Sequence, residues 1–382
     1  MTPRPFELHV PDADLADLRA RLALTRYAER PPGEPWALGT DPGWLRDLVE
    51  HWQHRFDWRA QEARLNAWPQ FKVRLAGIEV HFLQVPGRGP KPMPLLLSHG
   101  WPGSVFEFLE IVPLLTDPVR FGGDPADAFT VIVPSLPGYG LSFEPGQKRF
   151  AVQEIADVFA ELMHGVLGYR RYGAQGGDWG SFVTSCLGYA HAESLIGIHL
   201  NMMPLRRDMK RTAEATPAEA KYLDELGLWL KEETGYQAIQ GTRPQTLAAA
   251  LVDSPAGLAA WIGEKFRAWS DCGGDVESVF SKDALLANIS LYWFTGAIGA
   301  SFWPYYARLH GPWPVPEGAT IAVPSAYCEF PREILRPPRS LAERVYTDIR
   351  RWSVMPRGGH FAAMEQPHAL ADELRQFFAP LR

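Results

Sequence analysis

The sequence predicts an α/β fold in which a mostly parallel, eight-stranded sheet is covered by helices on both of its faces. Short apolar runs, typical of buried parallel strands, alternate with stretches of helical spacing along most of the 382 residues. Such strands are expected at 94–98, 129–133, 171–175, 195–200, 320–323 and 349–354. Helices are expected between and after them, at 105–115, 152–167, 182–192 and 367–378. This alternation is typical of a sheet whose parallel strands are joined by helices.

The first 70 residues are expected to form an arm that packs against the rest of the chain. A short strand and an amphipathic helix are predicted within 7–30, and one further helix near 44–56. The apolar residues of this arm are too scattered to build a core of their own. Between residues 71 and 85, apolar and polar residues alternate around Ala76-Gly77, which predicts a hairpin that begins the core.

Residues 204–312 interrupt the alternation of strands and helices, and we expect them to form a helical cap over the end of the sheet. Helices are predicted here at 217–230, 246–251, 256–270 and 282–292. Thr216 followed by Pro217 is typical of a helix N-cap with proline at the first helical position. The predicted organisation is therefore an arm at 1–70, a core at 71–203 and 313–382, and a cap at 204–312.

Composition and charge argue against several classes of protein. The formal net charge is −6, from 38 basic and 44 acidic residues without a block of Lys or Arg, so nucleic acid is not an expected partner. No apolar run approaches the roughly 18–20 residues that span a bilayer, and no secretory signal is visible. The three cysteines, Cys186, Cys272 and Cys328, show neither disulfide nor zinc spacing. We therefore expect a protein of the cytoplasm.

The strongest local motif is Gly176-Gly-Asp178-Trp-Gly180. It follows a predicted strand and opens a predicted helix, and its small residues permit a sharp turn that exposes the central side chain. Such a turn is typical of the α/β-hydrolase fold, where the central residue is in most enzymes a serine. Here it is Asp178, and no Gly-x-Ser-x-Gly motif occurs in the chain. The alternative interpretation is that Asp178 only caps the next helix.

An aspartate at this position predicts the class of reaction. Its carboxylate attacks an sp³ carbon and forms an alkyl ester, and water then attacks the carbonyl carbon of that ester, which regenerates the aspartate. The substrate must therefore carry an electrophilic carbon with a leaving group, as an epoxide or an alkyl halide does. This chemistry needs neither a metal nor an organic cofactor, and neither is predicted.

A second motif, His99-Gly-Trp101-Pro, directly follows the strand predicted at 94–98. In this fold the turn after that strand supplies one backbone N–H for an oxyanion, and the residue after the nucleophile supplies the other. The N–H groups of Trp101 and Trp179 are therefore expected to stabilise the oxyanion of ester hydrolysis. The alternative is a strand-end turn without a catalytic role.

The third motif is a glycine pair before His360, near the C-terminus and after the last predicted strand. The fold places its histidine last in chain order, so His360 is predicted as the general base that activates water beside Asp178. An acid should orient this imidazole from the loop after the preceding strand. The candidates are Glu329, Glu333 and Asp348, and composition does not separate the first two.

With these motifs the chain resembles the microsomal and juvenile-hormone type of epoxide hydrolase, together with its bacterial relatives. The motifs similar to those of the family are Phe6-Glu-Leu-His-Val-Pro, His99-Gly-Trp-Pro-Gly-Ser104, the Gly-Gly-Asp-Trp-Gly turn, Phe330-Pro-Arg-Glu-Ile-Leu335 and Arg357-Gly-Gly-His-Phe-Ala-Ala363. The likeness covers nearly the whole chain and is weakest at about 204–232. Membrane-bound members of the family carry an N-terminal anchor that is missing here, so a microsomal location is not expected.

The resemblance implies roles for residues that spacing alone leaves open. It implies that Glu333 is the acid that orients His360. It also implies that two cap tyrosines, Tyr236 and Tyr305, donate hydrogen bonds to the epoxide oxygen as the ring opens. Tyr306 is adjacent to Tyr305 and is the alternative second donor.

The expected function is hydrolysis of an epoxide to a vicinal diol through an ester of Asp178. One alternative is a hydrolytic dehalogenase of the haloalkane type, which needs halide donors such as the indole of Trp101. Another is a non-catalytic relative that only binds its ligand. Aromatic residues make up 12% of the chain, which favours a bulky apolar or aromatic epoxide as the substrate. The oligomeric state is open, and a homodimer is compatible with the sequence.

Overall fold

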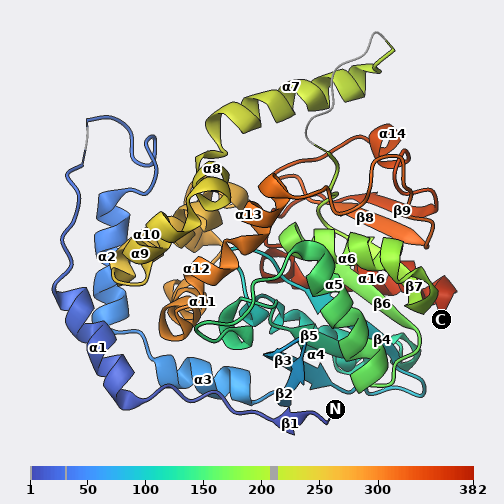
Figure 1. Ribbon diagram of the computed structural model, residues 1–382, viewed down its shortest axis with the longest axis horizontal. Coiled ribbons are helices and arrows are strands. Elements are labelled where there is room, and N and C mark those ends of the chain that lie inside the picture. Colours follow the sequence, from blue (N-terminus) through green and yellow to red (C-terminus); the bar gives the residue numbers. More distant parts are fainter. Residues whose placement is uncertain (1, 31, 207–213) are drawn as a thin grey trace.

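A single sheet of nine strands forms the centre of the protein in the computed structural model, which describes residues 2–30, 32–206 and 214–382 (Figure 1). In spatial order the strands are β1 Arg4–Pro5, β2 Gln70–Leu75, β3 Ile78–Val85, β5 Phe129–Pro134, β4 Met93–Ser98, β6 Tyr172–Gly176, β7 Leu195–Leu200, β8 Ser325–Glu329 and β9 Ile349–Val354. The pairs from β5 through β9 are parallel, whereas β1, β2, β3 and β5 pair antiparallel in that order. The sheet is thus mostly parallel, which confirms the predicted fold class.

Three predictions about the strands are wrong. The sheet has nine strands rather than eight, because the arm contributes β1, whose two residues are too few to show a periodicity. The short strand predicted within 7–30 does not form, because the backbone of Leu8 and Val10 bonds to the side chains of Asn66 and Glu62 instead of to a neighbouring strand. The segment 320–323 forms only an isolated bridge, between Ile321 and Tyr346, and the strand itself, β8, begins after Pro324. The apolar side chains of Ile321 and Val323 are buried because they pack beside Gly188 of helix α6 (Asp178–Ala190), outside the ladder of the sheet.

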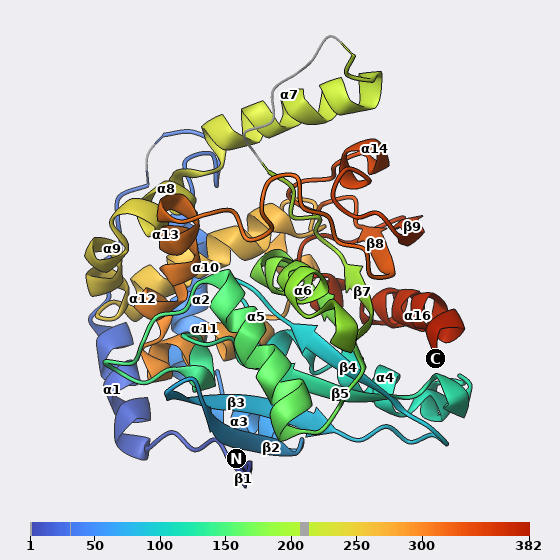
Figure 2. The ribbon, with the colours of Figure 1, turned by 45° about the vertical axis from the view of Figure 1, so that its right-hand side comes forward.

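Helices cover both faces of the sheet (Figure 2). Helix α5 (Val152–Ala160), which continues as a π-helical turn, packs with α6 on one face, and α4 (Ile111–Thr116) packs with α16 (Pro367–Phe378) on the other. The helix expected at 105–115 is divided, because a 3₁₀ turn at Val105–Phe108 precedes α4. Helix α6 begins at Asp178, earlier than predicted, because its first turn carries the motif residues rather than an apolar stripe. Two short helices, α14 (Arg339–Ala342) and α15 (Ala362–Glu365), belong to the last part of the sequence.

The N-terminal arm carries three helices, α1 (Asp12–Ala23), α2 (Pro42–His54) and α3 (Trp58–Asn66). They pack against α10 (Pro255–Trp269) and α11 (Lys282–Thr295) of the segment predicted as the cap. The sequence predicted α1 and α2 but not α3. The inward face of α3 carries Glu62, which breaks the apolar pattern although it is buried. Its carboxylate accepts hydrogen bonds from the indole of Trp58 at 2.7 Å and from the N–H of Val10 at 2.6 Å, which compensates its desolvation.

The segment predicted as the cap contains helices and loops but no strand among its described residues; residues 207–213 lie outside the described part. In chain order they are α7 Pro217–Glu232, α8 Gly235–Thr242, α9 Pro244–Leu251, α10 Pro255–Trp269, α11 Lys282–Thr295, α12 Ile298–Ser301 and α13 Trp303–His310. Thr216 caps α7 as predicted: its hydroxyl accepts from the N–H of Glu219 at 3.2 Å, and the Glu219 carboxylate accepts from the N–H of Thr216 at 2.9 Å. We call α7–α13 the cap helices.

Among the described residues, no single helix has the length and apolar composition needed to cross a bilayer. Two pairs of cap helices reach that length and composition only jointly, and they bend at their breaks by 118° and 103°.

Candidate active site

Asp178 lies at a sharp turn between strand β6 and helix α6. Its φ of 46° falls in the left-handed region, which a residue with a side chain adopts only where its surroundings hold it there. The backbone approaches itself closely at this turn: a Cβ at Gly176 would lie 2.1 Å from the carbonyl oxygen of Gly180, and a Cβ at Gly180 would lie 1.9 Å from that of Ser98. Only glycine fits at both positions, and the turn leaves Asp178 at the C-terminal end of β6.

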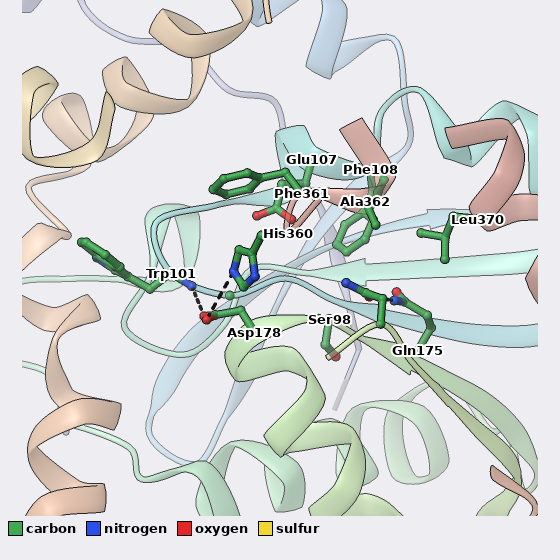
Figure 3. Close-up of a pocket in the computed structure, with 14 residues that line it drawn as sticks. Ser98, Trp101, Glu107, Phe108, Gln175, Asp178, His360, Phe361, Ala362 and Leu370 are labelled. Atoms are coloured by element: carbon green, nitrogen blue, oxygen red, sulfur yellow. Dashed lines mark hydrogen bonds and ion pairs between the residues drawn. The ribbon is translucent and has the colours of Figure 1, made fainter. Parts of the chain in front are cut away.

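The carboxylate of Asp178 lies between a backbone amide and an imidazole (Figure 3). The N–H of Trp101 donates a hydrogen bond of 2.7 Å to Oδ1 of Asp178, and Nε2 of His360 lies 3.5 Å from Oδ2. Trp101 can come this close because residue 100 is glycine: a Cβ there would lie 2.2 Å from Oδ1. Among the described hydrogen bonds, none joins the backbone amide of Trp179 to this carboxylate. The roles of both amides toward an oxyanion stay predictions.

The turn that carries Trp101 is attached to cap helix α11. The side-chain amide of Asn288 donates a hydrogen bond of 2.8 Å to the carbonyl oxygen of Pro102, and the hydroxyl of Tyr292 donates one of 2.8 Å to that of Gly103. All of these groups are buried. Sequence reasoning did not identify Asn288 or Tyr292, because nothing in their local pattern distinguishes them from other residues of an apolar helix.

His99 secures the same turn from the side of the core. Its Nε2 accepts a hydrogen bond of 3.2 Å from the N–H of Leu136, and its Nδ1 lies 3.1 Å from the carbonyl oxygen of Gly100. Burial lowers the pKa of the His99 imidazole to about 4. The ring is therefore neutral at pH 7, with its proton on Nδ1, and its role is structural.

His360 and Glu333 form a buried pair beside Asp178. Nδ1 of His360 donates to Oε1 of Glu333 at 2.6 Å, and the N–H of Ile334 donates to the same oxygen at 2.7 Å. Burial alone would lower the pKa of the His360 imidazole, but the carboxylates of Glu333 and Asp178 outweigh burial and hold that pKa well above its usual range. The resting imidazole is therefore a cation that lies between two carboxylates.

The two other acids that the sequence left open do not reach His360. Glu329 lies at the end of β8 and is only partly buried. Asp348 forms an exposed ion pair with Arg350 at 2.8 Å. Of the three candidates, the structure brings only Glu333 to the imidazole.

The loop that carries His360 is bound to the C-terminal end of cap helix α10. The N–H of His360 donates to the carbonyl oxygen of Trp269 at 2.9 Å, and the N–H of Gly358 donates to the Asp271 carboxylate at 2.9 Å. In return, the carboxyl group of Glu365 accepts from the N–H of Asp271 at 2.8 Å. The position of the imidazole therefore depends on the cap as well as on the sheet.

Tyr236 on α8 and Tyr305 on α13 both lie over the turn with Trp101. The ring of Tyr236 stacks on the indole of Trp101 at 5.4 Å, and the ring of Tyr305 meets the same indole edge-on at 5.8 Å. The hydroxyl of Tyr305 is buried, and its proton has no acceptor among the described residues, although the indole of Trp179 lies close enough to donate to its oxygen. Burial raises the pKa of the Tyr305 phenol well above its usual range, and the Tyr236 phenol and Asp178 add to this, so its O–H keeps the proton.

Tyr306 faces a different part of the molecule from Tyr305. Its ring stacks on His310 at 4.1 Å and on Trp303 at 5.0 Å. It lines a separate groove of about 420 Å³ together with Lys148 and Arg149. Two adjacent residues of a helix point about 100° apart, which explains why only one of them reaches the site.

Two small cavities meet at Asp178. One, of about 10 Å³, is lined by Tyr236, Tyr305 and Trp179 and will be called the tyrosine cavity. The other, of about 20 Å³, is lined by His360 and Glu107 and will be called the inner cavity (Figure 3). A cavity needs about 10–15 Å³ to hold one water, so a substrate can occupy the tyrosine cavity only if side chains or cap helices move. Among the described residues, no group of His, Cys, Asp and Glu is arranged to hold a metal ion.

The chain is similar to known proteins over nearly its whole length. It matches a family model described as the epoxide hydrolase N terminus over residues 3–108 and one described as the alpha/beta hydrolase fold over residues 93–253. It is 36% identical to epoxide hydrolase 1 of Oryctolagus cuniculus over 403 residues, which cover 98% of this chain and 88% of that protein.

Solved structures of epoxide hydrolases also cover all of this chain. The Aspergillus niger epoxide hydrolase has a TM-score of 0.85 and 32% sequence identity, with 97% of that chain covered. The juvenile hormone epoxide hydrolase of the silkworm Bombyx mori has a TM-score of 0.86 and 30% identity, with 95% of that chain covered.

Proposed function

This chain belongs to the epoxide hydrolase family and is a hydrolase that acts on epoxides, and from this premise we propose that Asp178 is the nucleophile that opens the ring. The observation that carries this proposal is the position of the Asp178 carboxylate. One oxygen accepts a hydrogen bond from the N–H of Trp101, and the other lies beside Nε2 of His360. The carboxylate also lines the tyrosine cavity, where an electrophile would meet phenol donors.

In the first step, Tyr236 and Tyr305 hold the epoxide oxygen while Oδ2 of Asp178 attacks a ring carbon. A carbon–oxygen bond to Asp178 forms, and the ring carbon–oxygen bond breaks. The ring oxygen takes the electron pair and a proton from one phenol, so no free alkoxide forms in the apolar cavity. The phenolate that remains takes back a proton from the His360 imidazolium once Asp178 is an ester. The hydroxyl of Tyr305 supports this role, because its proton has no acceptor among the described residues and a buried donor without an acceptor is costly unless a ligand satisfies it.

In the second step, water hydrolyses the ester of Asp178. Esterification removes the negative charge of Asp178, and with it one of the two carboxylates that raise the pKa of His360. The imidazole then gives up its proton more easily, and as a neutral base it takes a proton from water, whose oxygen attacks Cγ of Asp178. The N–H groups of Trp101 and Trp179 stabilise the oxyanion that forms, and its collapse releases the diol and restores the carboxylate.

An oxygen-18 experiment tests this route directly. With enzyme in excess over styrene oxide in H₂¹⁸O, the first turnover should place the label in the carboxylate of Asp178, because water attacks the ester carbonyl rather than the substrate. The diol should carry the label only in later turnovers. Label in the diol after one turnover would exclude an ester of Asp178.

Glu333→Gln should lower the rate of ester hydrolysis by about 10²–10⁴-fold, because the amide orients the imidazole poorly and does not stabilise its cation. The pH profile should also move. Glu333 raises the pKa of His360, so its loss shifts the rise of the hydrolysis rate with pH to lower pH. Single-turnover rates measured against pH check both effects. Glu329→Gln is the matched control, because the same change on β8 does not touch His360, and a profile that moves equally in both variants would contradict the assignment.

Removal of the cap hydroxyls should slow ring opening without preventing substrate binding. We expect Tyr236→Phe and Tyr305→Phe each to lower the rate of ester formation by about 10–100-fold, and the double variant by more than about 10³-fold. Tyr306→Phe serves as the control and should react like the unmodified enzyme, because its ring lies in another groove. A loss in Tyr306→Phe that equals the loss in Tyr305→Phe would reverse the choice between them.

We propose that the chain is divided around this site into a core, a cap and an arm. Residues 71–203 and 313–382 form the hydrolase core, residues 204–312 form the cap that supplies the phenols, and residues 1–70 form an arm that holds the cap. Aromatic side chains such as Trp179 and Phe182 line the tyrosine cavity, which supports a bulky apolar or aromatic epoxide as the substrate.

A further inference from the structure

Glu107 is a carboxyl group at the catalytic centre that the two steps above do not use. It lies on the 3₁₀ turn Val105–Phe108, directly after the turn that carries Trp101. Figure 3 shows its carboxyl group beside the ring of His360. The side chain is partly buried and lines the inner cavity. An acid in such a place is costly unless it has a partner or a function.

The inner cavity has the size and the polar lining of a water site. Its volume of about 20 Å³ exceeds the roughly 10–15 Å³ that one water needs. Besides Glu107 and His360, it is lined by Ser98 and Gln175, whose Oγ and Oε1 atoms have no hydrogen-bond partner among the described residues. A water with several polar partners is stable in such a cavity. The tyrosines line the other cavity, so substrate and this water would meet Asp178 in separate spaces.

The position of the Glu107 carboxyl group is built into the preceding turn. A Cβ at Gly103 would lie 1.3 Å from Oε1 of Glu107 and 2.4 Å from its Cδ. The carboxyl group can lie against the turn only because residue 103 has no side chain. The N–H of Ser104 donates a hydrogen bond to the same group, which fixes its direction.

The charged groups that face Glu107 are Asp178 and His360, and the phenol of Tyr292 lies near it as a neutral group. Burial raises the pKa of Glu107 to about 8; Asp178 adds to this, whereas His360 and the Ser104 amide oppose it. Glu107 is therefore a neutral acid at pH 7. A second carboxylate in this cavity would pair with the His360 cation and hinder the loss of its proton after Asp178 has become an ester.

We propose that Glu107 is the positioning residue for the hydrolytic water, which it holds in the inner cavity between its carboxyl oxygen and Nε2 of His360. The inference rests on the proposed function, because it assumes an ester of Asp178. One hydrogen of the water points to His360 and the other to the carbonyl oxygen of Glu107. The water oxygen then faces Cγ of the Asp178 ester, and no substrate atom lies between them.

The chemical step balances without a further reactant. The water gives one proton to Nε2 of His360, and its oxygen forms a bond to Cγ of Asp178. When the tetrahedral intermediate collapses, the bond from Cγ to the substrate oxygen breaks. That oxygen takes the proton from His360 and leaves as the second hydroxyl of the diol. The carboxyl group of Asp178 then gives its proton to Nε2 of His360, which restores the carboxylate and the imidazolium of the resting enzyme. Glu107 keeps its proton throughout and only orients the water.

The test separates ester formation from ester hydrolysis with styrene oxide as the probe substrate. Rapid acid quenching and intact-protein mass spectrometry follow the ester on Asp178 over time. Glu107→Leu should lower the rate of ester hydrolysis by about 100-fold, whereas the rate of ester formation should stay within about threefold of the unmodified enzyme. Glu107→Gln keeps a neutral acceptor at the same place and should recover hydrolysis to within about tenfold. Glu329→Gln, outside both cavities, is the matched control.

A second variant keeps the carboxyl group of Glu107 but changes its position. Gly103→Ala should displace the carboxyl group of Glu107 and slow hydrolysis while ester formation persists, which also covers the case in which Glu107→Leu does not fold. The inference is overturned if hydrolysis in Glu107→Leu and Gly103→Ala stays within about threefold of the unmodified enzyme, or if both rates fall together. If the unmodified enzyme forms no ester at all, the proposed function fails instead.

Discussion

Asp178→Ala should abolish diol formation, with a loss of at least about 10⁴-fold in kcat. The reason is that both steps use the same side chain: its carboxylate attacks the ring, and its carbonyl carbon is the atom that water attacks. Asp178 is the only carboxyl group among the described residues that line the tyrosine cavity, so no neighbouring acid can replace it. Residual hydrolysis would come only from the phenols, which can polarise the epoxide for a direct and slow attack by water.

Steady-state formation of diol from styrene oxide measures this loss. Asp14→Ala, which removes an exposed acid from the first turn of α1, is the control and should leave the rate unchanged. The melting temperature of Asp178→Ala should show that the variant is folded. Retention of more than about 1% of the activity in a folded Asp178→Ala would contradict a mechanism through its ester.

His360→Gln should separate the two steps and trap the intermediate. Ester formation needs the Asp178 carboxylate and the phenols, so it should continue within about tenfold of the normal rate. Hydrolysis needs the base, so it should fall by about 10³–10⁴-fold. The variant should therefore consume about one equivalent of epoxide and then stop, while the mass of the protein increases by that of one substrate.

Intact-protein mass spectrometry after mixing with styrene oxide measures the trapped ester. His191→Gln, which alters a partly exposed histidine paired with Asp157 at 2.8 Å, should turn over normally. A His360→Gln variant that forms no ester and hydrolyses nothing would mean that the imidazole also acts in ring opening.

The parts of the site that lie within one continuous motif could be predicted from the sequence. Residues 176–180 could be interpreted from the sequence alone, because the glycines and the aspartate together define the turn. The fold class could be predicted for the same reason, since apolar runs and helical spacing are local signals. The strand at 320–323 was predicted wrongly, because burial against α6 and burial in the sheet require the same apolar residues.

The parts of the site that could not be predicted depend on contacts between segments that are distant in the sequence. The choice of Glu333 over Glu329 depends on how the loop after β8 folds back toward His360, and spacing does not contain that information. Glu107 showed no signal beyond a charged residue within an otherwise apolar stretch. Its burial, and the glycine at 103 that makes room for it, are visible only in three dimensions. Helices α8, α12 and α13 were not predicted; they have eight, four and eight residues, and so few turns give only a weak periodic signal.

The hydrogen bonds that join the loop of His360 to Trp269 and Asp271 bear on how this family can diversify. If the cap helices were exchanged between relatives, the residues that cover the substrate would change. The imidazole, however, would lose the backbone hydrogen bonds that align it. Functional chimaeras should therefore transplant the C-terminal segment around 358–365 along with α10. The end of α10 and the loop that carries the base thus form one structural unit, although they lie almost a hundred residues apart in the chain.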